Sequence, residues 1–148
     1  MLEQVMGTKP TEMANEPSTS EGTPDSPAEA LAYVVDDEPL VAQVVAGMLE
    51  AGGLNPVVFH NPLTAFKTFI AAHPRPRLLV TDYVMNWLNG MELIAQCKQA
   101  DPGLKTILFS GNVDHSITSR YAVQPDRFFN KPLQLDSLVE TARNLIQP

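Results

Sequence analysis

The sequence of 148 residues has little of what several protein classes require. It contains one cysteine, Cys97, and three scattered histidines, which excludes a disulfide framework and a zinc site built from Cys and His. No run approaches the roughly 18 consecutive apolar residues of a membrane-spanning helix, and no basic segment followed by an apolar one opens the chain. We therefore expect a cytoplasmic protein that does not contact a membrane.

Basic residues are also scarce, and charge is unevenly distributed along the chain. The formal net charge is −7; residues 1–30 carry six acidic and one basic side chain, and residues 31–148 carry eleven and nine. No strongly basic surface can form to neutralise the phosphates of a nucleic acid, so we expect no direct binding to nucleic acid. Residues 1–29 are acidic and rich in Ser, Thr and Pro, which predicts a disordered tail before one domain over residues 30–148.

Short apolar runs alternate with segments of helical periodicity from residue 31 onward. Apolar residues make up 44% of the chain, which is enough for a core. The runs predict strands at 31–35, 57–59, 77–82, 106–110 and 127–130. Strands that alternate with helices are typical of an α/β protein with a parallel sheet covered on both faces. The nearly continuous apolar character of the runs agrees with strands that are buried on both faces.

Helical periodicity is clear in four segments, 39–51, 62–70, 90–100 and 135–146. The apolar stripe of the first comprises Leu40, Val41, Val44, Val45, Met48 and Leu49, and that of the second comprises Leu63, Phe66, Phe69 and Ile70. Prolines 39 and 62 suit the first turn of a helix. Residues 113–125 hold Ser and Thr in place of strong helix formers and end at a proline, so a helix there should be short or irregular.

Polar side chains end four of the predicted strands. Ligands bind at the carboxyl ends of the strands in this architecture, and the residues expected there are Asp36, Asp37, Asp82, Ser110 and Lys131. Adjacent carboxylates repel by roughly 1–4 kcal/mol per pair, so either some of them stay protonated or a cation compensates their charge. Oxygen ligands alone favour Mg²⁺ or another hard divalent ion. Such a site could accept a phosphoryl group on a carboxylate, with the metal and the lysine stabilising its oxygens.

Taken together, these motifs resemble the receiver domain of two-component response regulators, of the type seen in the bacterial chemotaxis regulator. The matching segments follow the order of the family; they are Val34-Val-Asp-Asp-Glu-Pro39, Leu79-Val-Thr-Asp82 with Met85 and Gly90, Ile107-Leu-Phe-Ser-Gly111, and Phe129-Asn-Lys-Pro132. The resemblance spans residues 30–147. It implies a doubly wound, flavodoxin-like sheet of five parallel strands in the order 2-1-3-4-5.

The resemblance also implies roles for the residues at the strand ends. Asp82 would accept a phosphoryl group from a histidine kinase or a histidine phosphotransfer protein. Asp37 and Asp82 would bind Mg²⁺ directly, Asp36 would bind it mainly through water, and the main-chain carbonyl of Val84 would complete the protein ligands. Lys131 would pair with Asp82 and then with the phosphoryl oxygens.

Two further residues would respond to phosphorylation if the resemblance holds. Ser110 would hydrogen-bond the phosphate and draw the loop after the fourth strand inward, and Phe128, at the switch aromatic position of the family, would follow. The Lys131–Pro132 bond corresponds to one that is cis in the family. The domain would signal by contact with a downstream protein, as a monomer or weak dimer, and its only chemistry would be its own phosphorylation and dephosphorylation.

The chain departs from the family pattern in two segments. The usual Met-Pro-x-Met-Asp-Gly reads here Met85-Asn-Trp-Leu-Asn-Gly90. We expect Trp87 to pack within this loop near the mouth of the site, and the alternative is contact with a partner protein. Residues 113–125 lack the usual amphipathic fourth helix, so the dimer and target contacts of the family cannot be transferred to this chain.

Several alternatives remain open from the sequence alone. We expect a stand-alone regulator, which Met1 favours, and the alternative is a receiver from a hybrid kinase or a longer regulator with residues 1–29 as linker. A Mg²⁺-dependent phosphatase with an aspartate nucleophile is weaker, because such enzymes commonly separate two aspartates by one residue after the first strand. The full set of three aspartates, serine and lysine argues against a pseudo-receiver that is not phosphorylated, although the altered loop 86–89 keeps this alternative open. A nucleotide-binding protein is weaker still, because no glycine-rich loop follows the first strand.

Overall fold

The computed structural model describes residues 30–111, 115–132 and 134–147. The predicted tail, residues 1–29, lies outside the described residues. In chain order the elements are β1 (Leu31–Val35), α1 (Pro39–Ala51), β2 (Asn55–Phe59), α2 (Pro62–Ala71), β3 (Leu78–Asp82), α3 (Gly90–Ala100), β4 (Lys105–Ser110), α4 (His115–Thr118), β5 (Arg127–Asn130) and α5 (Leu135–Ile146).

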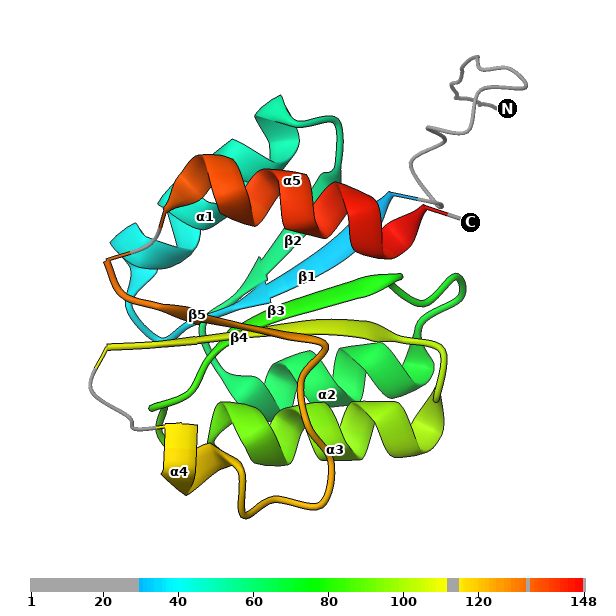
Figure 1. The fold of residues 1–148 in the computed structure, drawn as a ribbon. Coiled ribbons are helices and arrows are strands. Elements are labelled where there is room, and N and C mark those ends of the chain that lie inside the picture. The colour runs from blue at the N-terminus through cyan, green and yellow to red at the C-terminus, as the bar shows by residue number, and fades with distance from the viewer. Residues whose placement is uncertain (1–29, 112–114, 133, 148) are drawn as a thin grey trace, which may run out of the picture.

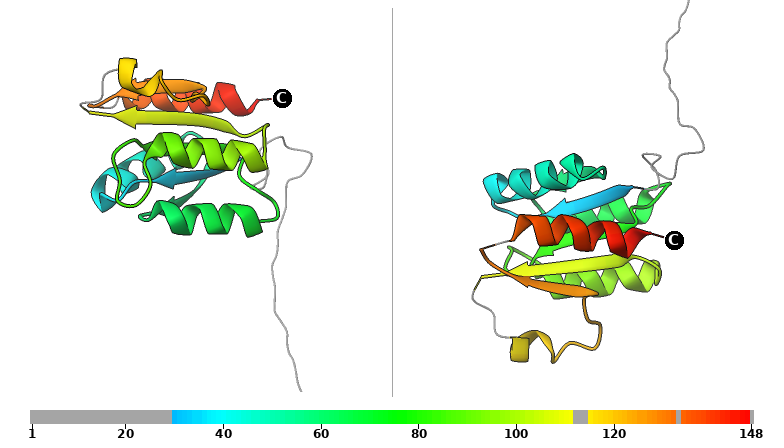
Figure 2. Two further views of the ribbon diagram at one scale, coloured as in Figure 1. Left: turned by 90° about the horizontal axis from the view of Figure 1, so that it is seen from below. Right: turned by 45° about the horizontal axis from the view of Figure 1, so that its top comes forward.

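The five strands form one parallel sheet in the order β2-β1-β3-β4-β5. Helices α1 and α5 cover one face of the sheet, and α2 and α3 cover the other (Figure 1). The two views of Figure 2 show the same three layers from other sides. The predicted fold class and strand order are therefore confirmed, and α4, with four residues, is as short as expected.

The ends of the elements follow from local chemistry. Helix α1 stops before Gly53, whose φ of 98° lies in the left-handed region that favours glycine. Strand β2 begins at Asn55, two residues before the predicted start, and includes Pro56. A proline is tolerated there because β2 is at the edge of the sheet. Asn61 caps α2 by accepting hydrogen bonds from the main-chain N–H of Leu63 and Thr64.

Two hydrophobic clusters, built from side chains of the sheet and of its helices, fill the space between them. One, on the α1 and α5 face, includes Val34, Val45, Leu49, Val80 and Leu138. The other, on the α2 and α3 face, includes Tyr33, Phe69, Leu79, Ile94 and Leu108, and we call it the α2/α3 core. Burial of both faces explains why β3 is buried along its whole length.

The apolar stripes predicted for α1 and α2 are only partly buried. Leu40 is 76% exposed and Val44 53%, and Leu63 and Ile70 are also exposed. Ala42, Val45 and Leu49 are the buried residues of α1. Successive residues turn by about 100° around a helix, so Leu40 and Val44 lie on another face of α1 than these three. The apolar periodicity therefore predicts a wider buried face for α1 and α2 than the structure has.

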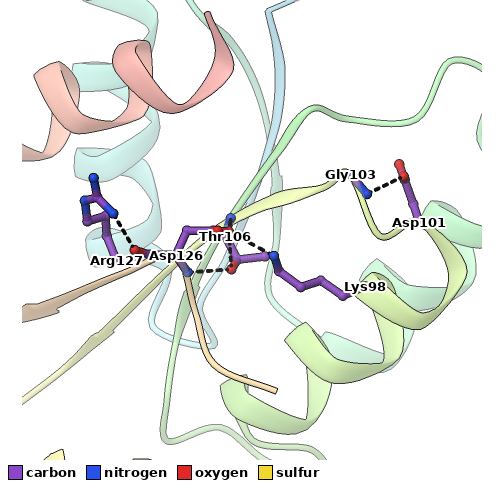
Figure 3. A network of polar contacts seen from close by, with 6 residues as sticks. All are labelled: Lys98, Asp101, Gly103, Thr106, Asp126 and Arg127. Atoms are coloured by element: carbon purple, nitrogen blue, oxygen red, sulfur yellow. Dashed lines mark hydrogen bonds and ion pairs between the residues drawn. The ribbon is translucent and has the colours of Figure 1, made fainter. Parts of the chain in front are cut away.

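An ion-paired network anchors the start of β5 (Figure 3). The Asp126 carboxylate accepts hydrogen bonds from the main-chain N–H and the hydroxyl of Thr106, at 2.7 and 3.0 Å, and Lys98 Nζ of α3 lies 3.0 Å from it. The network ties β5 to β4 and to α3. It thus helps to set the position of β5, which Lys131 directly follows.

Among the described residues, no helix combines the length and apolar character needed to cross a lipid bilayer.

Candidate functional site

Three carboxylates meet at the carboxyl ends of β1 and β3. Asp36 and Asp37 directly follow β1, and Asp82 is the last residue of β3. Each offers one oxygen, and these oxygens all lie within 4.8 Å of one another. Adjacent parallel strands β1 and β3 place their ends at the same edge of the sheet, so residues 46 positions apart in the chain become neighbours. We call this cluster the acidic site.

Asp36 is fully buried, and only one of its two carboxylate oxygens has a hydrogen-bond partner among the described residues. Its Oδ1 accepts a hydrogen bond from the Glu38 main-chain N–H at 2.9 Å. Its Oδ2 is buried and has no hydrogen-bond partner among the described residues. Buried polar atoms nearly always have a partner, so this oxygen indicates a missing hydrogen-bond donor, such as a metal-bound water.

The electrostatics of the acidic site favour a cation. The pKa of Asp36 is raised to about 6, mainly by burial, while the hydrogen bond from the Glu38 main chain lowers it and the nearby charge of Asp82 adds a smaller rise. Burial also raises the pKa of Asp82, although Lys131 opposes this shift. Buried carboxylates with raised pKa values gain most from a positive ion. An all-oxygen donor set with an unsatisfied carboxylate oxygen therefore fits Mg²⁺.

Lys131 reaches the acidic site from the residue after β5. Its Nζ lies 3.6 Å from Asp82 Oδ1 and 3.8 Å from Glu38 Oε1, and 5.3 Å from the centre of the Phe109 ring. Lys131 is held by its main-chain N–H, which donates to the Ser110 carbonyl at 2.9 Å. The lysine is thus shared between two carboxylates, and the sequence did not indicate the contribution of Glu38.

Ser110 and Phe128 occupy neighbouring strands beside the acidic site. Ser110 ends β4 and is 1% exposed, and its hydroxyl oxygen has no hydrogen-bond partner among the residues that the structure describes. Phe128 pairs with Leu108 in the register of β4 and β5 and packs, half-buried, against the α2/α3 core. The Lys131–Pro132 bond is cis, as the resemblance implies.

The loop between β3 and α3, residues 83–89, forms one rim of the site. Trp87 is 72% exposed and has a φ of 70°, so the expectation that its ring packs within the loop is wrong. Met85 and Leu88, rather than Trp87, are the residues of this loop segment that pack against the α2/α3 core. Val84 is 64% exposed. The Asn86 main-chain N–H donates to Asp37 Oδ2 at 3.4 Å.

Main-chain groups of this loop also contact Asp82 directly. The Tyr83 N–H donates to Asp82 Oδ1 at 2.8 Å. The Tyr83 carbonyl accepts from the Gly90 N–H at 2.9 Å, which closes the loop at its base. The hydroxyl of Tyr83 lies 3.2 Å from that of Tyr121, a residue that the sequence gave no reason to connect with the site.

Comparison with known sequences finds a matching family model and related proteins. A sequence model of the response regulator receiver domain family matches residues 32–143. The chain is 26% identical over 117 residues to the DNA-binding transcriptional regulator NtrC of Escherichia coli, covering 78% of this chain and 24% of NtrC. It is 28% identical over 127 residues to the C4-dicarboxylate transport transcriptional regulatory protein DctD of Pseudomonas aeruginosa, covering 81% of this chain and 26% of DctD. The chain thus spans about a quarter of the length of these relatives.

Solved structures show the same fold. A response regulator receiver domain protein from Clostridium thermocellum superposes with a TM-score of 0.72 at 23% identity, covering 79% of this chain and 94% of that one. The receiver domain of NtrX from Brucella abortus superposes with a TM-score of 0.68 at 25% identity, covering 78% and 97%.

Proposed function

Because the chain belongs to the response regulator receiver domain family of two-component systems, we propose that it accepts a phosphoryl group on Asp82 in a Mg²⁺-dependent reaction. The observation that carries the proposal is the convergence of Asp36, Asp37 and Asp82 within 4.8 Å, with Lys131 beside Asp82. The donor is a phosphohistidine of a histidine kinase or of a histidine phosphotransfer protein. The N–P bond of the donor breaks while an O–P bond forms at a carboxylate oxygen of Asp82.

The three carboxylates of the acidic site and one main-chain carbonyl have different roles in Mg²⁺ binding. Asp37 and Asp82 bind it directly, Asp36 binds it mainly through water, and the main-chain carbonyl of Val84 adds a ligand. The unsatisfied Asp36 Oδ2 supports a water-mediated role, because it can accept a hydrogen bond from a metal-bound water. When bound, Mg²⁺ supplies positive charge that offsets the repulsion between the carboxylates and the incoming phosphoryl oxygens.

Lys131 and Ser110 act on the transferred group. Lys131 Nζ, at 3.6 Å from Asp82 Oδ1, is near enough to move onto a phosphoryl oxygen by a small side-chain rotation. The buried hydroxyl of Ser110 hydrogen-bonds another phosphoryl oxygen, and its lack of a partner among the described residues supports this role. Movement of Ser110 towards the phosphate changes the space beside Phe128, which then follows as the switch residue.

Signalling then occurs through protein contact. Leu40 and Val44 are exposed beside Lys131 and Pro132, and together with Leu135 they line a shallow apolar groove next to the acidic site. Apolar groups gathered beside a polar site are typical of a protein interface. We expect a cytoplasmic monomer or weak dimer that binds a kinase and a downstream protein, without contact with nucleic acid. The phosphoryl step is the same in a stand-alone regulator and in a segment of a longer one.

Intact mass spectrometry tests the proposal. The protein is incubated with acetyl phosphate and Mg²⁺, and we expect it to gain the mass of one phosphoryl group. The gain should disappear in Asp82→Asn and when Mg²⁺ is chelated. Asp136→Asn is the matched control, because Asp136 is exposed in α5 and lies beside Met48 and Gly52 at the C-terminal end of α1; this variant should be phosphorylated like the wild type.

Two results would contradict the proposal. A phosphoryl group that remains in Asp82→Asn would place the acceptor elsewhere. Release of many equivalents of phosphate per chain, without a stable mass gain, would instead support the phosphatase alternative.

A further inference from the structure

A single hydroxyl group ties both ends of the loop 83–89 to a distant segment. Tyr83 is the first residue of this loop and Asn89 is the last, since β3 ends at Asp82 and α3 begins at Gly90. The Tyr121 hydroxyl lies 3.2 Å from the Tyr83 hydroxyl and accepts a hydrogen bond from Asn89 Nδ2 at 3.0 Å. Tyr121 itself belongs to the segment between α4 and β5, 32 residues beyond Asn89.

The orientation of the Asn89 amide is set by the helix that follows it. Asn89 Oδ1 accepts a hydrogen bond from the Glu92 N–H at 2.8 Å, and Glu92 Oε1 accepts one from the Asn89 N–H at 2.9 Å. This capping box at the start of α3 occupies the amide oxygen. The Nδ2 group therefore points away from the helix end and is available to donate to Tyr121.

Tyr121 is held from its own side as well. Gln124 Nε2 donates to the carbonyls of Thr118 and Tyr121, at 2.9 and 2.7 Å, and the Tyr121 N–H donates to the Thr118 carbonyl at 3.1 Å. The Tyr121 ring packs, half-buried, against the α2/α3 core. A residue fixed at its main chain, its ring and its hydroxyl can restrain the groups that it contacts.

The restrained loop carries several groups that face the acidic site. The Tyr83 N–H donates to Asp82 Oδ1, and the Asn86 N–H approaches Asp37 Oδ2. The loop also contains Val84, whose carbonyl is a proposed metal ligand, and Trp87, whose left-handed backbone is strained for a residue with a side chain. The loop therefore needs outside support to keep this geometry.

We propose that Tyr121 is a positioning residue for phosphoryl acceptance: its hydroxyl joins Tyr83 to Asn89 and so holds the loop 83–89 in the conformation that binds Mg²⁺. This inference rests on the proposed function of Asp82. This role of Tyr121 is distinct from the roles of Ser110 and Phe128, because Tyr121 connects the segment between α4 and β5 to the loop 83–89. By linkage, a partner that displaces Tyr121 weakens Mg²⁺ binding, and Mg²⁺ binding in turn opposes that partner.

Removal of the hydroxyl alone tests the inference. In Tyr121→Phe the ring remains, while the hydrogen bonds to Tyr83 and Asn89 are lost. We expect the Mg²⁺ concentration for half-maximal phosphorylation by acetyl phosphate to rise about three- to tenfold, which corresponds to the loss of about one ordinary hydrogen bond. The maximal rate at saturating Mg²⁺ should change much less, because the acceptor and Lys131 are untouched. Fluorescence of Trp87, the one tryptophan of the chain, gives a second readout of Mg²⁺ binding.

The matched control is Tyr33→Phe. Tyr33 lies in β1, is 4% exposed and belongs to the same α2/α3 core, where its ring contacts those of Phe59 and Phe69. The same atom is removed from the same cluster, so any effect of core repacking is common to both variants. Tyr33→Phe should keep the half-saturating Mg²⁺ concentration of the wild type.

A second variant, Tyr83→Phe, distinguishes coupling between the Tyr121 and Tyr83 hydroxyls from a general loss of folding. Tyr83→Phe should shift the Mg²⁺ requirement in the same direction, and the double variant should shift it by less than the two single effects combined. If Tyr121→Phe and Tyr33→Phe require the same Mg²⁺ concentration while the wild type gains its phosphoryl group, the inference is wrong and the proposed function stands. A wild type that gains no phosphoryl group overturns the proposed function, and the inference with it.

Discussion

At the scale of single residues, burial sets the chemistry of the acidic site. Asp36 is fully buried, and one of its oxygens has no hydrogen-bond partner among the described residues. Desolvation disfavours the ionised carboxylate, so the pKa of Asp36 rises to about 6. The same cause raises the pKa of Asp82. Protons and metal ions therefore compete for this site in the range just below neutral pH.

The first prediction follows from this competition. Below pH 6 Asp36 is mostly protonated, so Mg²⁺ affinity should fall as the pH drops from 7 to 5 and reach a plateau above 7. Isothermal titration calorimetry at a series of pH values measures the affinity and the number of protons released. An affinity that is constant between pH 5 and 7 would contradict the raised pKa of Asp36.

The same shift affects stability in the absence of metal. The folded-state pKa of Asp36 is above its unfolded value of about 4, so the folded state binds more protons between pH 4 and 6. For this group alone, the free energy of unfolding therefore decreases as the pH rises through that window. In Asp36→Asn this contribution should be absent, which urea denaturation at pH 4.5 and 7 can measure.

At the scale of elements, a close approach between β3 and α3 positions the acceptor. A Cβ atom on Gly90, the first residue of α3, would overlap the Asp82 carbonyl oxygen and lie 2.6 Å from Leu108 Cδ1. The helix can therefore begin directly beside the acceptor only with a glycine at this position. The end of β3 and the start of α3 must separate if a side chain is introduced there.

We expect Gly90→Ala to lower both stability and phosphorylation. The alanine Cβ would press on the Asp82 main chain, which cannot move without displacing the Asp82 side chain. The free energy of unfolding should therefore fall by about 1–3 kcal/mol. Gly47→Ala is the matched control: a Cβ there meets no atom within 4 Å inside α1, and alanine favours a helix, so stability should rise slightly. Equal stability of the two variants in urea denaturation would show that the approach at Gly90 is not restrictive.

The ion-paired network around Asp126 lies at the amino end of β5, whereas the acidic site lies at the carboxyl ends of the strands. Burial raises the pKa of Asp126, but the hydrogen bonds from Lys98 and Thr106 outweigh this effect and lower it overall. A depressed pKa stabilises the fold above the unfolded value of about 4, and this stabilisation is lost as the pH falls through the folded-state pKa. Asp126 therefore contributes to the stability of the strand that leads to Lys131.

Asp126→Ala should lower the free energy of unfolding at pH 7 by about 1–3 kcal/mol, since it leaves the Thr106 N–H and hydroxyl without their acceptor. The destabilisation relative to the wild type should diminish as the pH is lowered below 4. Asp101→Ala is the control. Among the bonds drawn in Figure 3, the Asp101 carboxylate accepts only the exposed Gly103 N–H, so this variant should lower the free energy of unfolding by less. A larger loss for Asp101→Ala would contradict the anchoring role of Asp126.

At the scale of the whole molecule, folding brings like charges together. Asp37 and Asp82 come from different strand ends, and their proximity is unfavourable until a cation binds. A ligand that binds only the folded state stabilises it by mass action. Metal binding and folding are therefore coupled through the sheet, which holds the two strand ends at a fixed separation.

Mg²⁺ should accordingly raise the thermal unfolding midpoint of the wild type. At a Mg²⁺ concentration ten times its dissociation constant, we expect a stabilisation of about 1.4 kcal/mol. Asp37→Asn removes a proposed ligand and one negative charge, so this variant should be more stable than the wild type without Mg²⁺ and should gain little from it. Differential scanning calorimetry with and without Mg²⁺ measures both effects, and an equal gain in the two proteins would exclude Asp37 as a ligand.

Much of this molecule could be predicted from local patterns. The parallel sheet and the nearness of Asp36, Asp37 and Asp82 followed from strands that alternate with helices and end in acids, because parallel strands present their carboxyl ends at one edge. The strand order followed only from the resemblance to receiver domains. The prediction for Trp87 was wrong for a physical reason. The side chain is 72% exposed and its backbone is left-handed, and a large apolar side chain does not by itself indicate either feature.

The sequence by itself determined which residues end the strands, where most helices begin, and that α4 is short, because capping, periodicity and backbone preferences act over a few residues. Only the tertiary structure decided that Lys131 is shared between Asp82 and Glu38, that Leu40 is exposed, and that Tyr121 joins the two ends of the loop 83–89. These contacts join residues far apart in the chain. Their geometry depends on how the helices and loops settle on the sheet, which no local pattern specifies.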